Sequence, residues 1–474
     1  MESKKSNLHV LLVSYPSQGH INPLLRLAKC LASRGLFVTF STTESVGQMM
    51  AQEATNTTSS TNIGLGELRF EFFSDGWDSH ERVRGNFDAW MHQLETAGRE
   101  SFTELVNRQS RAGRPVSCII NNPFVPWASD VAAELGIPFA VLWVQSCSVY
   151  SVYYHFHYQL AKFPTTGQED MNLDLPSLPT LGFRDIPDFL TLNPFDSLRQ
   201  VILSQFNKLD KSICVLVDSF EELEREIVKT MSHLSVPVRP IGPLFKSTNV
   251  SVRGDLWKAT DDCLQWLDSQ SPNSVVYVSF GTLVTLSKEQ TEELSSGLLK
   301  AGSPFLWVAK NPPKDMGAKP ELSDGFKEEA EGKGMVVEWC PQDQVLAHPA
   351  VSCFVTHCGW NSSMESLSSG VPVIAFPQWG DQNMNAKFLV DVYRVGLRMR
   401  KSTSERHGGG DALVDRDEVA RCIFEVTKGD GAKEMKENAM KWKHAAEEAG
   451  VGGGSSYQNV QLLIDDIQRT ASNQ

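Results

Sequence analysis

The stretch from residue 334 to residue 382 constrains the fold more than any other part of the chain. Three apolar runs in it are bounded by turn residues, as buried strands are: residues 334–338, 351–356 and 373–376. The segment after the first run has Pro341 at its start and Pro349 as its stop, which is typical of a helix. A second helix is expected between the second and third runs, with Gly370 after its end. Buried strands that alternate with helices form parallel sheets, so this stretch predicts an α/β fold.

A tight turn at residues 357–359 connects the second strand to the second helix, which is expected to begin near Trp360. We expect this turn to need its glycine. Backbone N–H groups and the positive end of the helix dipole then point at whatever lies above the turn, and this arrangement favours phosphate. His357 can add a donor, and Asn361 and Ser362 lie in the first turn of the helix. Such sheets bind ligands at the carboxyl ends of their strands, so the sequence predicts an anion site here.

Two carboxylates in the same stretch are placed to bind hydroxyl groups. Glu365 lies one turn after Asn361 on the same helical face, where it can accept hydrogen bonds from a pair of ribose hydroxyls. The third strand leads to Asp381 and Gln382, and a carboxylate beside an amide suits adjacent sugar hydroxyls. Taken singly these features are common in α/β proteins, where Glu365 is an exposed helix residue and Trp339 a core residue. Only their combination is informative.

Taken together, the residues from Trp339 through Gln382 resemble the signature box of plant family-1 UDP-glycosyltransferases. The resemblance implies base contacts from Trp339 and the backbone of Cys340, and ribose contacts from Gln342 and Glu365. It implies diphosphate contacts from His357, Asn361 and Ser362, and sugar contacts from Trp360, Asp381 and Gln382. A glutamine at the last position goes with glucose as the donor sugar, as a tendency of the family.

Length and composition exclude several classes of protein. A chain of 474 residues predicts two or three domains, each large enough for its own core. A formal net charge of −13 argues against a surface for nucleic acid or anionic membranes. No apolar run approaches the length of a membrane span, and the run at residues 9–15 is too short for a secretory signal, so we expect a cytoplasmic protein. The nine cysteines contain no C-x-x-C pair and are odd in number, which predicts reduced thiols.

The first half of the chain opens with the same alternation. A strand is expected at residues 8–14, then a loop at 15–20, a helix with Pro23 near its start, and a strand at 36–41, which together predict a βαβ unit. Further strands are expected at 68–73, 116–120, 139–144 and 214–218, and further helices at 87–107, 125–135 and 146–160. Three prolines and a glycine at residues 237–243, followed by a polar segment to about Gly254, indicate a linker, after which the alternation restarts.

The alternation in both halves predicts two Rossmann-like domains, and the family resemblance implies that they face each other across a cleft in the GT-B architecture. Residues 1–245 are expected to form an N-terminal domain that binds the acceptor. Residues 246–456 are expected to form a C-terminal domain that binds the UDP-sugar. The resemblance further implies that a helix at residues 457–470 returns to the first domain. Neither half contains the G-x-G-x-x-G fingerprint of nicotinamide-dependent oxidoreductases, a class that shares these fold elements.

His20 is the best candidate for the residue that does the chemistry. It ends the first strand-to-helix loop, at the carboxyl end of a strand, and histidine has an unperturbed pKa that suits a general base near neutral pH. A histidine that caps the helix for structural reasons fits the sequence equally well. The family resemblance favours the catalytic role, because the base of that family lies in the matching loop.

The chain departs from the family at the residue that orients this base. Most members have an aspartate there, and the matching position here is Asn122. An asparagine can hold an imidazole by a hydrogen bond but cannot stabilise imidazolium, so His20 is expected to be a weak base. A phenol, with a pKa near ~10, needs a base to react, whereas a carboxylic acid, with a pKa near ~4, is already ionised. We therefore hypothesise that the chain makes glucose esters of carboxylic acids.

Four segments resemble the plant subgroup that glucosylates hydroxycinnamic, benzoic or gallic, limonoid and auxin-type acids: residues 70–77, 119–124, 142–147 and 380–382. The resemblance implies one inverting displacement, in which the acceptor oxygen attacks the anomeric carbon of UDP-glucose and a β-glucose ester forms. Thr282, His357 and the helix N-terminus at Asn361 and Ser362 are expected to stabilise the charge that grows on UDP. We find no D-x-D cluster or other carboxylate pair that is well placed for a metal, so neither a metal nor another cofactor is expected beside the donor substrate UDP-glucose.

Two other functions fit the same residues. A phenolic O-glucosyltransferase would have another group that orients His20. A silent UDP-sugar-binding protein is the non-enzyme alternative, against which the presence of His20 argues. Acceptor pockets in this fold are built from first-domain loops, here 75–92, 145–155 and 183–195, and in them Arg82, Arg84 and His92 are either a carboxylate clamp or ordinary surface charges. The sequence specifies neither the acceptor acid nor an oligomeric state.

Overall fold

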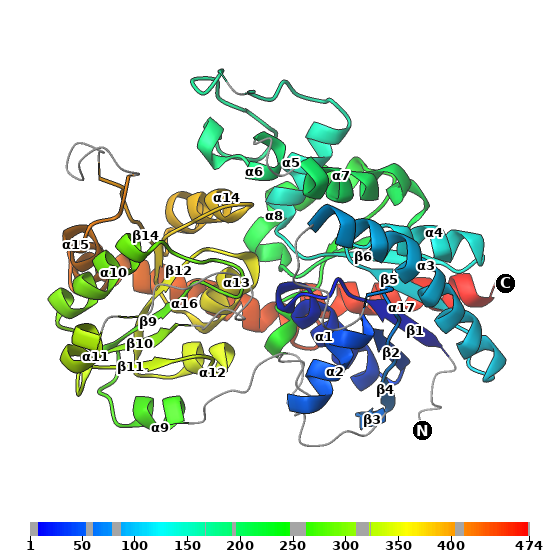
Figure 1. Cartoon of the computed structure of the whole chain (residues 1–474). Helices are drawn as coiled ribbons and strands as arrows, with labels where there is room; N and C mark the ends of the chain where they lie inside the picture. The colour runs from blue at the N-terminus through cyan, green and yellow to red at the C-terminus, as the bar shows by residue number, and fades with distance from the viewer. Residues whose placement is uncertain are drawn as a thin grey trace. The chain divides into compact units, whose positions relative to one another are not determined.

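A computed structural model describes residues 8–53, 60–77, 87–165, 167–191, 196–246, 262–309, 322, 324–402 and 412–472. By its internal contacts the chain divides into two compact units. The first consists of residues 1–256 together with 446–474, and the second of residues 257–445. Each unit has its own sheet with helices packed against it, so the predicted α/β class is confirmed (Figure 1).

The first unit is built on an eight-stranded sheet with the order β3-β4-β2-β1-β5-β6-β7-β8. Neighbouring strands are parallel except β3 and β4, which are antiparallel. β1 lies in the interior of the sheet, and all of its residues are buried. The strands are β1 (His9–Val13), β2 (Phe37–Ser41), β3 (Ser60–Ile63), β4 (Gly66–Phe70), β5 (Cys118–Asn121), β6 (Phe139–Trp143), β7 (Val215–Val217) and β8 (Val238–Pro240).

Helices connect these strands. They are α1 (Gln18–Ser33), α2 (Glu44–Glu53), α3 (Phe87–Arg111), α4 (Trp127–Glu134), α5 (Cys147–His157), α6 (Asp188–Thr191), α7 (Asp196–Ser204), α8 (Glu221–Thr230) and α17 (Ser455–Ser472), with short 3-10 turns at η1 (Phe183–Asp185), η3 (Gln205–Lys211), η4 (Met231–His233) and η5 (Leu244–Lys246). In α1 the leucines recur at helical spacing, and Leu24, Leu27 and Leu31 are fully buried. This apolar face packs on the sheet and fixes the helix that carries His20.

The first helix begins earlier than its proline predicts. α1 starts at Gln18, so His20 lies in the first turn of the helix and not in the loop before it. Ser17 has an extended backbone at the N-cap, and its carbonyl already accepts the N–H groups of His20 and Ile21. Pro23 therefore lies inside the helix, where the helix lacks one backbone hydrogen bond but its first turn still forms.

Residues 237–243, where the composition predicts a linker, include the edge strand β8. β8 pairs in parallel with β7, and Pro240 lies in it opposite Val217. An edge strand leaves one side of its backbone without a partner strand, so it tolerates a proline that a central strand would not. The first part of the predicted linker therefore belongs to the edge of the sheet.

The second unit is built on a six-stranded sheet with the order β11-β10-β9-β12-β13-β14, in which all neighbours are parallel. Its strands are β9 (Val275–Ser279), β10 (Phe305–Val308), β11 (Gly334–Val337), β12 (Val351–Thr356), β13 (Val373–Ala375) and β14 (Gly396–Arg398). Its helices are α9 (Asp262–Asp268), α10 (Lys288–Ala301), α11 (Asp324–Ala330), α12 (Gln342–Ala347), α13 (Trp360–Ser369), α14 (Gln382–Lys387), the π-helix η6 (Phe388–Val392), α15 (Arg416–Thr427) and α16 (Ala432–Gly450), the last of which runs on into the first unit.

Successive residues of these strands point to opposite faces of the sheet, and each face has its own core. On one face, Val276 and Val278 of β9 pack with buried residues of α10 and α15. On the other face, Val275 and Tyr277 pack with buried residues of α9 and α12. Strands covered on both faces are apolar throughout, which is why they are recognisable as continuous apolar runs.

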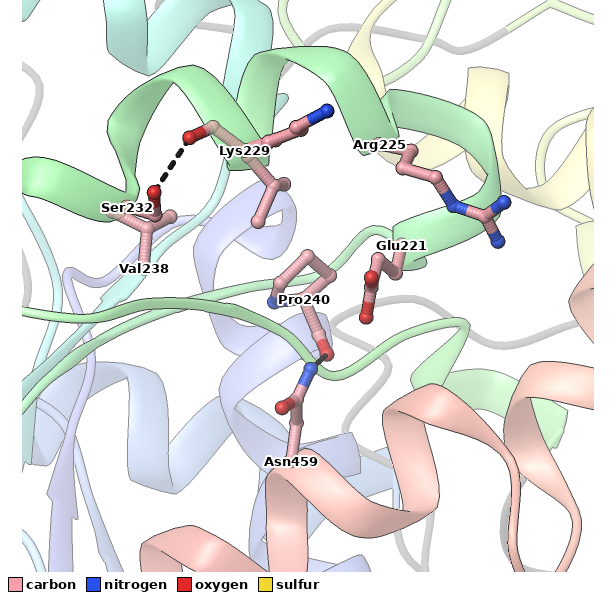
Figure 2. A pocket seen from close by; sticks show the side chains of 8 residues that line it. Glu221, Arg225, Lys229, Ser232, Val238, Pro240 and Asn459 are labelled. Carbon is pink, nitrogen blue, oxygen red and sulfur yellow. Dashed lines mark hydrogen bonds between the residues drawn. The ribbon is translucent and has the colours of Figure 1, made fainter.

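Helix α17 packs along β8 in the first unit. Asp466 forms an ion pair with Arg239 at 2.7 Å, and both side chains are largely withdrawn from solvent. The Asn459 amide donates a hydrogen bond to the Pro240 carbonyl at 2.8 Å. Asn459 and Pro240 also line a cavity of about 370 Å³ beside α8 (Figure 2). The edge of the eight-stranded sheet is thus covered by a helix from the far end of the described chain.

Candidate active site

The predicted donor-binding residues follow the carboxyl ends of four strands in the second unit. Trp339 follows β11, His357 follows β12, and residues 381–382 come after β13. Gly281 and Thr282 follow β9, which lies between β10 and β12. Because all these strands are parallel, their carboxyl ends lie at one edge of the sheet. The fold therefore brings together residues that are far apart in the sequence.

The turn between β12 and α13 needs its glycine for space. The residue with a left-handed backbone is Cys358, at φ +65°, whereas Gly359 has φ −59° and forms the N-cap of α13. A Cβ atom on Gly359 would lie 2.4 Å from Nε2 of His357. A Cβ atom on Gly281, where φ is +70°, would lie 2.8 Å from the same nitrogen. The imidazole of His357 is thus held between two glycines, and any side chain at either position would displace it.

Burial lowers the pKa of His357 from 6.5 to about 4, and a hydrogen bond to the backbone of Ser279 opposes this shift. The imidazole is therefore neutral at physiological pH. A neutral ring beside the N-terminus of α13 can offer a hydrogen bond to an anion, while the helix dipole and the first backbone N–H groups supply the positive potential.

Gln342, Ser362 and Glu365 form one hydrogen-bonded group between α12 and α13. The Gln342 amide nitrogen donates to Oε2 of Glu365 at 2.7 Å and to the Ser362 hydroxyl at 2.9 Å. The Gln342 amide oxygen accepts from the hydroxyl of Tyr277 at 2.9 Å. Glu365 is only 4% exposed, so the exposed helix residue that its sequence position alone suggests is excluded. A buried carboxylate held in this way is arranged to receive hydroxyl donors.

The loop after β13 is tied to the phosphate turn by Asn385. Its amide nitrogen donates to the Cys358 carbonyl at 3.0 Å and to Oδ2 of Asp381 at 2.7 Å. The amide oxygen of Gln382 accepts the backbone N–H groups of Gln378 at 2.9 Å and Trp379 at 3.3 Å. The loop thus uses the acceptor half of the Gln382 amide, and the N–H half is what this residue can offer to a sugar.

The other predicted donor-binding residues lie at the same strand ends. Cys340 and Trp360 are buried, while Trp339 and Thr282 are half-buried. Asn361 lies in the first turn of α13, directly before Ser362. These residues therefore lie along the same edge of the six-stranded sheet as His357 and Gln382.

His20 and Asn122 meet in the first unit, at the ends of β1 and β5. Nδ1 of His20 lies 3.0 Å from Oδ1 and 2.9 Å from Nδ2 of Asn122. The Asn122 oxygen also accepts the backbone N–H of Phe124 at 2.9 Å, which fixes the orientation of the amide. The neighbouring Asn121 is bound elsewhere, to Ser129 and other buried groups, so Asn122 is the residue in contact with the imidazole.

Aromatic rings surround the imidazole of His20. Phe124 and Tyr15 contact it edge-on, with ring centroids 4.5 and 5.0 Å away, and Trp90 packs on Tyr15 at 5.4 Å. Burial lowers the pKa of His20 to about 4, although the hydrogen bond to Asn122 acts in the opposite direction. The ring is therefore neutral at physiological pH and lies in an aromatic environment.

Comparisons with known proteins decide the family. Residues 6–185 match the family described as glycosyltransferase, N-terminal domain, and residues 194–406 match UDP-glucoronosyl and UDP-glucosyl transferase. Gallate 1-beta-glucosyltransferase 84A24 of Punica granatum is 51% identical over 470 residues, which are 98% of this chain and 90% of the relative. This chain belongs to the plant family-1 UDP-glycosyltransferases. The family resemblance of residues 339–382 is thereby confirmed.

Further relatives agree on the family and on the fold of this glycosyltransferase. The limonoid UDP-glucosyltransferase of Citrus unshiu is 48% identical over 472 residues, covering 98% of this chain and 91% of the relative. The crystal structure of Os79 from O. sativa in complex with UDP matches with a TM-score of 0.83 at 31% identity, covering 98% of this chain and 100% of that one. The glycosyltransferase therefore has the α/β GT-B fold, and it is an enzyme of the hexosyltransferase type.

Sequence reasoning missed two residues that bond to the predicted donor-binding residues, Tyr277 and Asn385. Their polar groups are buried and bonded to the predicted residues, but no local pattern signals such contacts. His92 is exposed on α3, and Arg82 and Arg84 lie outside the described residues. Among the residues that the structure describes, no cluster of His, Cys, Asp and Glu could hold a metal ion, and no helix is long and apolar enough to cross a membrane.

Proposed function

We propose that this glycosyltransferase transfers glucose from UDP-glucose to the carboxylate of a small aromatic or phenolic acid, which gives a β-glucose ester. The observation that carries the proposal is the Asn122 amide beside His20, where a carboxylate would be needed to make the imidazole a strong base. The names of the relatives support it, since they designate glucosyltransferases for gallate and limonoids.

Proton affinities favour an acid over a phenol. Transfer of a proton from a phenol with a pKa near ~10 to an imidazole whose conjugate acid has a pKa of about 4 is unfavourable by about 8 kcal/mol, at ~1.36 kcal/mol per pKa unit. An acid with a pKa near ~4 loses its proton to water before it binds, so its carboxylate needs no base. The weak base of this site is therefore sufficient for ester formation.

The Asn122 amide also allows His20 to act as a hydrogen-bond donor. Both atoms of the amide lie within bonding distance of Nδ1, so the ring can donate to Oδ1 or accept from Nδ2. When Nδ1 accepts, the proton is on Nε2, and Nε2–H can bind and orient an acceptor carboxylate. An aspartate would hold the proton on Nδ1 and exclude this arrangement. An amide at this position thus suits an anionic acceptor.

The donor side of the reaction is assigned to the second unit. The Trp339 ring would stack on uracil, the Cys340 backbone would bond the base, and Gln342 and Glu365 would bind the ribose hydroxyls. His357, Asn361, Ser362 and Thr282 would bind the diphosphate, and Trp360, Asp381 and Gln382 would bind the glucose. The carboxylate oxygen attacks the anomeric carbon as the bond to UDP breaks, and the N-terminus of α13 stabilises the negative charge that remains on UDP.

We place acceptor binding in residues 1–245 and donor binding in residues 246–456, and we place the enzyme in the cytoplasm. All nine cysteines are free thiols, and all are buried. Free thiols throughout a chain fit a reducing compartment.

The test is turnover of radiolabelled UDP-glucose with aromatic acids and with phenols of matched shape, such as 4-hydroxybenzoate and its methyl ester. Each product is then treated with mild alkali, which cleaves glucose esters and leaves phenolic glucosides intact. The proposal predicts an alkali-labile product that forms mainly from acids. An alkali-stable product that forms mainly from phenols would refute it and favour the phenolic O-glucosyltransferase, while tight UDP binding without turnover would leave only a silent binding protein.

A further inference from the structure

Tyr277 is a core residue whose hydroxyl has a specific task. It lies in β9 with no exposed surface, and its ring stacks on Phe354 of the neighbouring strand, with centroids 4.8 Å apart and planes at 24°. A phenylalanine would fill the same space and make the same stack. The hydroxyl alone distinguishes tyrosine here, and a buried hydroxyl is unfavourable unless it is hydrogen-bonded.

The hydroxyl of Tyr277 connects two predicted donor-binding residues. It donates to the amide oxygen of Gln342 at 2.9 Å and lies 3.3 Å from the sulfur of Cys340. Burial raises the pKa of the tyrosine well above its ordinary value and raises the pKa of the Cys340 thiol to about 12, so both groups keep their protons at physiological pH. The direction of these hydrogen bonds follows. The phenol donates its O–H to Gln342, and Cys340 donates its S–H to the phenol.

These hydrogen bonds fix the orientation of the Gln342 amide. Its oxygen faces the phenol, so its nitrogen faces Ser362 and Glu365, to which it donates at 2.9 and 2.7 Å. Both N–H hydrogens are thus used, and one lone pair of the oxygen remains for a ligand hydroxyl. Without the phenol, the amide oxygen would lose its donor and the amide could turn. Glu365 would then lose the hydrogen bond that holds its carboxylate.

We propose that Tyr277 is a positioning residue for the nucleotide: through Gln342 it holds Glu365 in the arrangement that receives both ribose hydroxyls, and so makes the enzyme select ribonucleotide donors over deoxyribonucleotide donors. The inference rests on the ribose role assigned to Gln342 and Glu365 above. Tyr277 itself touches no ligand in this assignment, because Gln342 lies between its hydroxyl and the ribose hydroxyls.

The test compares the binding of UDP and 2′-deoxy-UDP to the full-length wild type and to Tyr277→Phe by titration calorimetry. The wild type should bind UDP more tightly than 2′-deoxy-UDP. The variant should bind UDP about tenfold more weakly, the equivalent of one lost hydrogen bond, while its affinity for 2′-deoxy-UDP, which keeps only the 3′-hydroxyl, should fall less. KM for UDP-glucose should rise with little change in kcat. Tyr393→Phe is the matched control, since Tyr393 is 2% exposed and packs on Trp442 in the same unit, and it should leave both affinities unchanged.

A second measurement separates positioning from a general loss of packing. In a Gln342→Ala background, Tyr277→Phe should have no further effect on the preference for UDP over 2′-deoxy-UDP, because the side chain through which Tyr277 acts on the ribose has already been removed. Equal weakening of UDP and 2′-deoxy-UDP by Tyr277→Phe, or no weakening of either, would overturn the inference. Equal wild-type affinity for both nucleotides would overturn it together with the ribose assignment. The ester proposal is judged separately, by the acid and phenol turnover of the wild type.

Discussion

Replacement of Asn122 by aspartate should shift the acceptor preference of this enzyme toward phenols. The new carboxylate would lie about 3 Å from Nδ1 of His20, in the place of the present amide oxygen. At a charge separation of ~4 Å and an effective dielectric constant of ~20, its attraction for imidazolium is about 4 kcal/mol. This corresponds to a rise of about 3 in the pKa of His20, from about 4 to about 7, where a general base works best.

Two opposite changes in rate follow from Asn122→Asp. If about half of the gained basicity is expressed in the transition state, kcat/KM for phenols should rise about thirtyfold. For acids it should fall about tenfold, because the aspartate fixes the proton on Nδ1, removes the Nε2–H donor and adds a negative charge near the acceptor carboxylate. The ratio of phenol to acid turnover should therefore change by more than a hundredfold.

The assay measures kcat/KM for 4-hydroxybenzoate and its methyl ester from pH 5 to pH 9. The variant should show an inflection near pH 7 with the phenol, and the wild type should not. Asn122→Ala is the control, since it removes the amide without adding charge and should lower both activities. A ratio within about threefold of wild type in Asn122→Asp, together with no new inflection, would refute the reasoning about this pair.

Three further changes test other parts of the structure. Burial lowers the pKa of His9 from 6.5 to about 4, so as the pH falls the unfolded chain is protonated first and the folded state loses stability. Between pH 6.5 and pH 4 the loss in the free energy of unfolding, measured with urea, should be about 3 kcal/mol smaller in His9→Gln than in the wild type. Equal losses in the two proteins would contradict this. Glu224 accepts two N–H groups at the start of α5, so Glu224→Gln should lower the free energy of unfolding by about 3 kcal/mol, and an unchanged urea midpoint would exclude this capping role. Asn385→Ala should weaken UDP-glucose binding more than UDP binding, because Asn385 orients Asp381; calorimetry that shows equal weakening would argue against it.

Most strands in the interior of both sheets could be predicted from the sequence, as could the edge strand β11, whereas the edge strands β3 and β8 could not. The strand at residues 351–356 and the helix that begins at Trp360 lie where the sequence predicts them. A strand that is buried on both faces consists of apolar residues throughout, and proline and glycine mark its ends. Strands β3 and β8 are edge strands with polar or proline residues, so their local pattern resembles that of a loop.

The candidate site was predictable to the extent that its residues follow strand ends. The glycines and prolines that end the strands locate His357 and Gln382, and the resemblance of residues 339–382 to a known family indicates the ligand. The partner of His20 could be matched by that likeness alone, since 102 positions separate the two residues. The role of Tyr277 could not be found in either way. Nothing in the sequence of an apolar strand indicates that the hydroxyl of its tyrosine bonds to a residue 65 positions away.

The covering of β8 by α17 has a consequence for synthesis on the ribosome. Asn459 emerges 219 positions after its partner Pro240, and the Asp466 that neutralises Arg239 emerges later still. The first unit is therefore translated first but acquires its last element only after the second unit has left the exit tunnel. Until then its edge strand is open to pairing with a neighbouring nascent chain, which is a recognised route to aggregation. Expression of the first half alone should need chaperones, or a supplied peptide with the sequence of α17, to remain in solution.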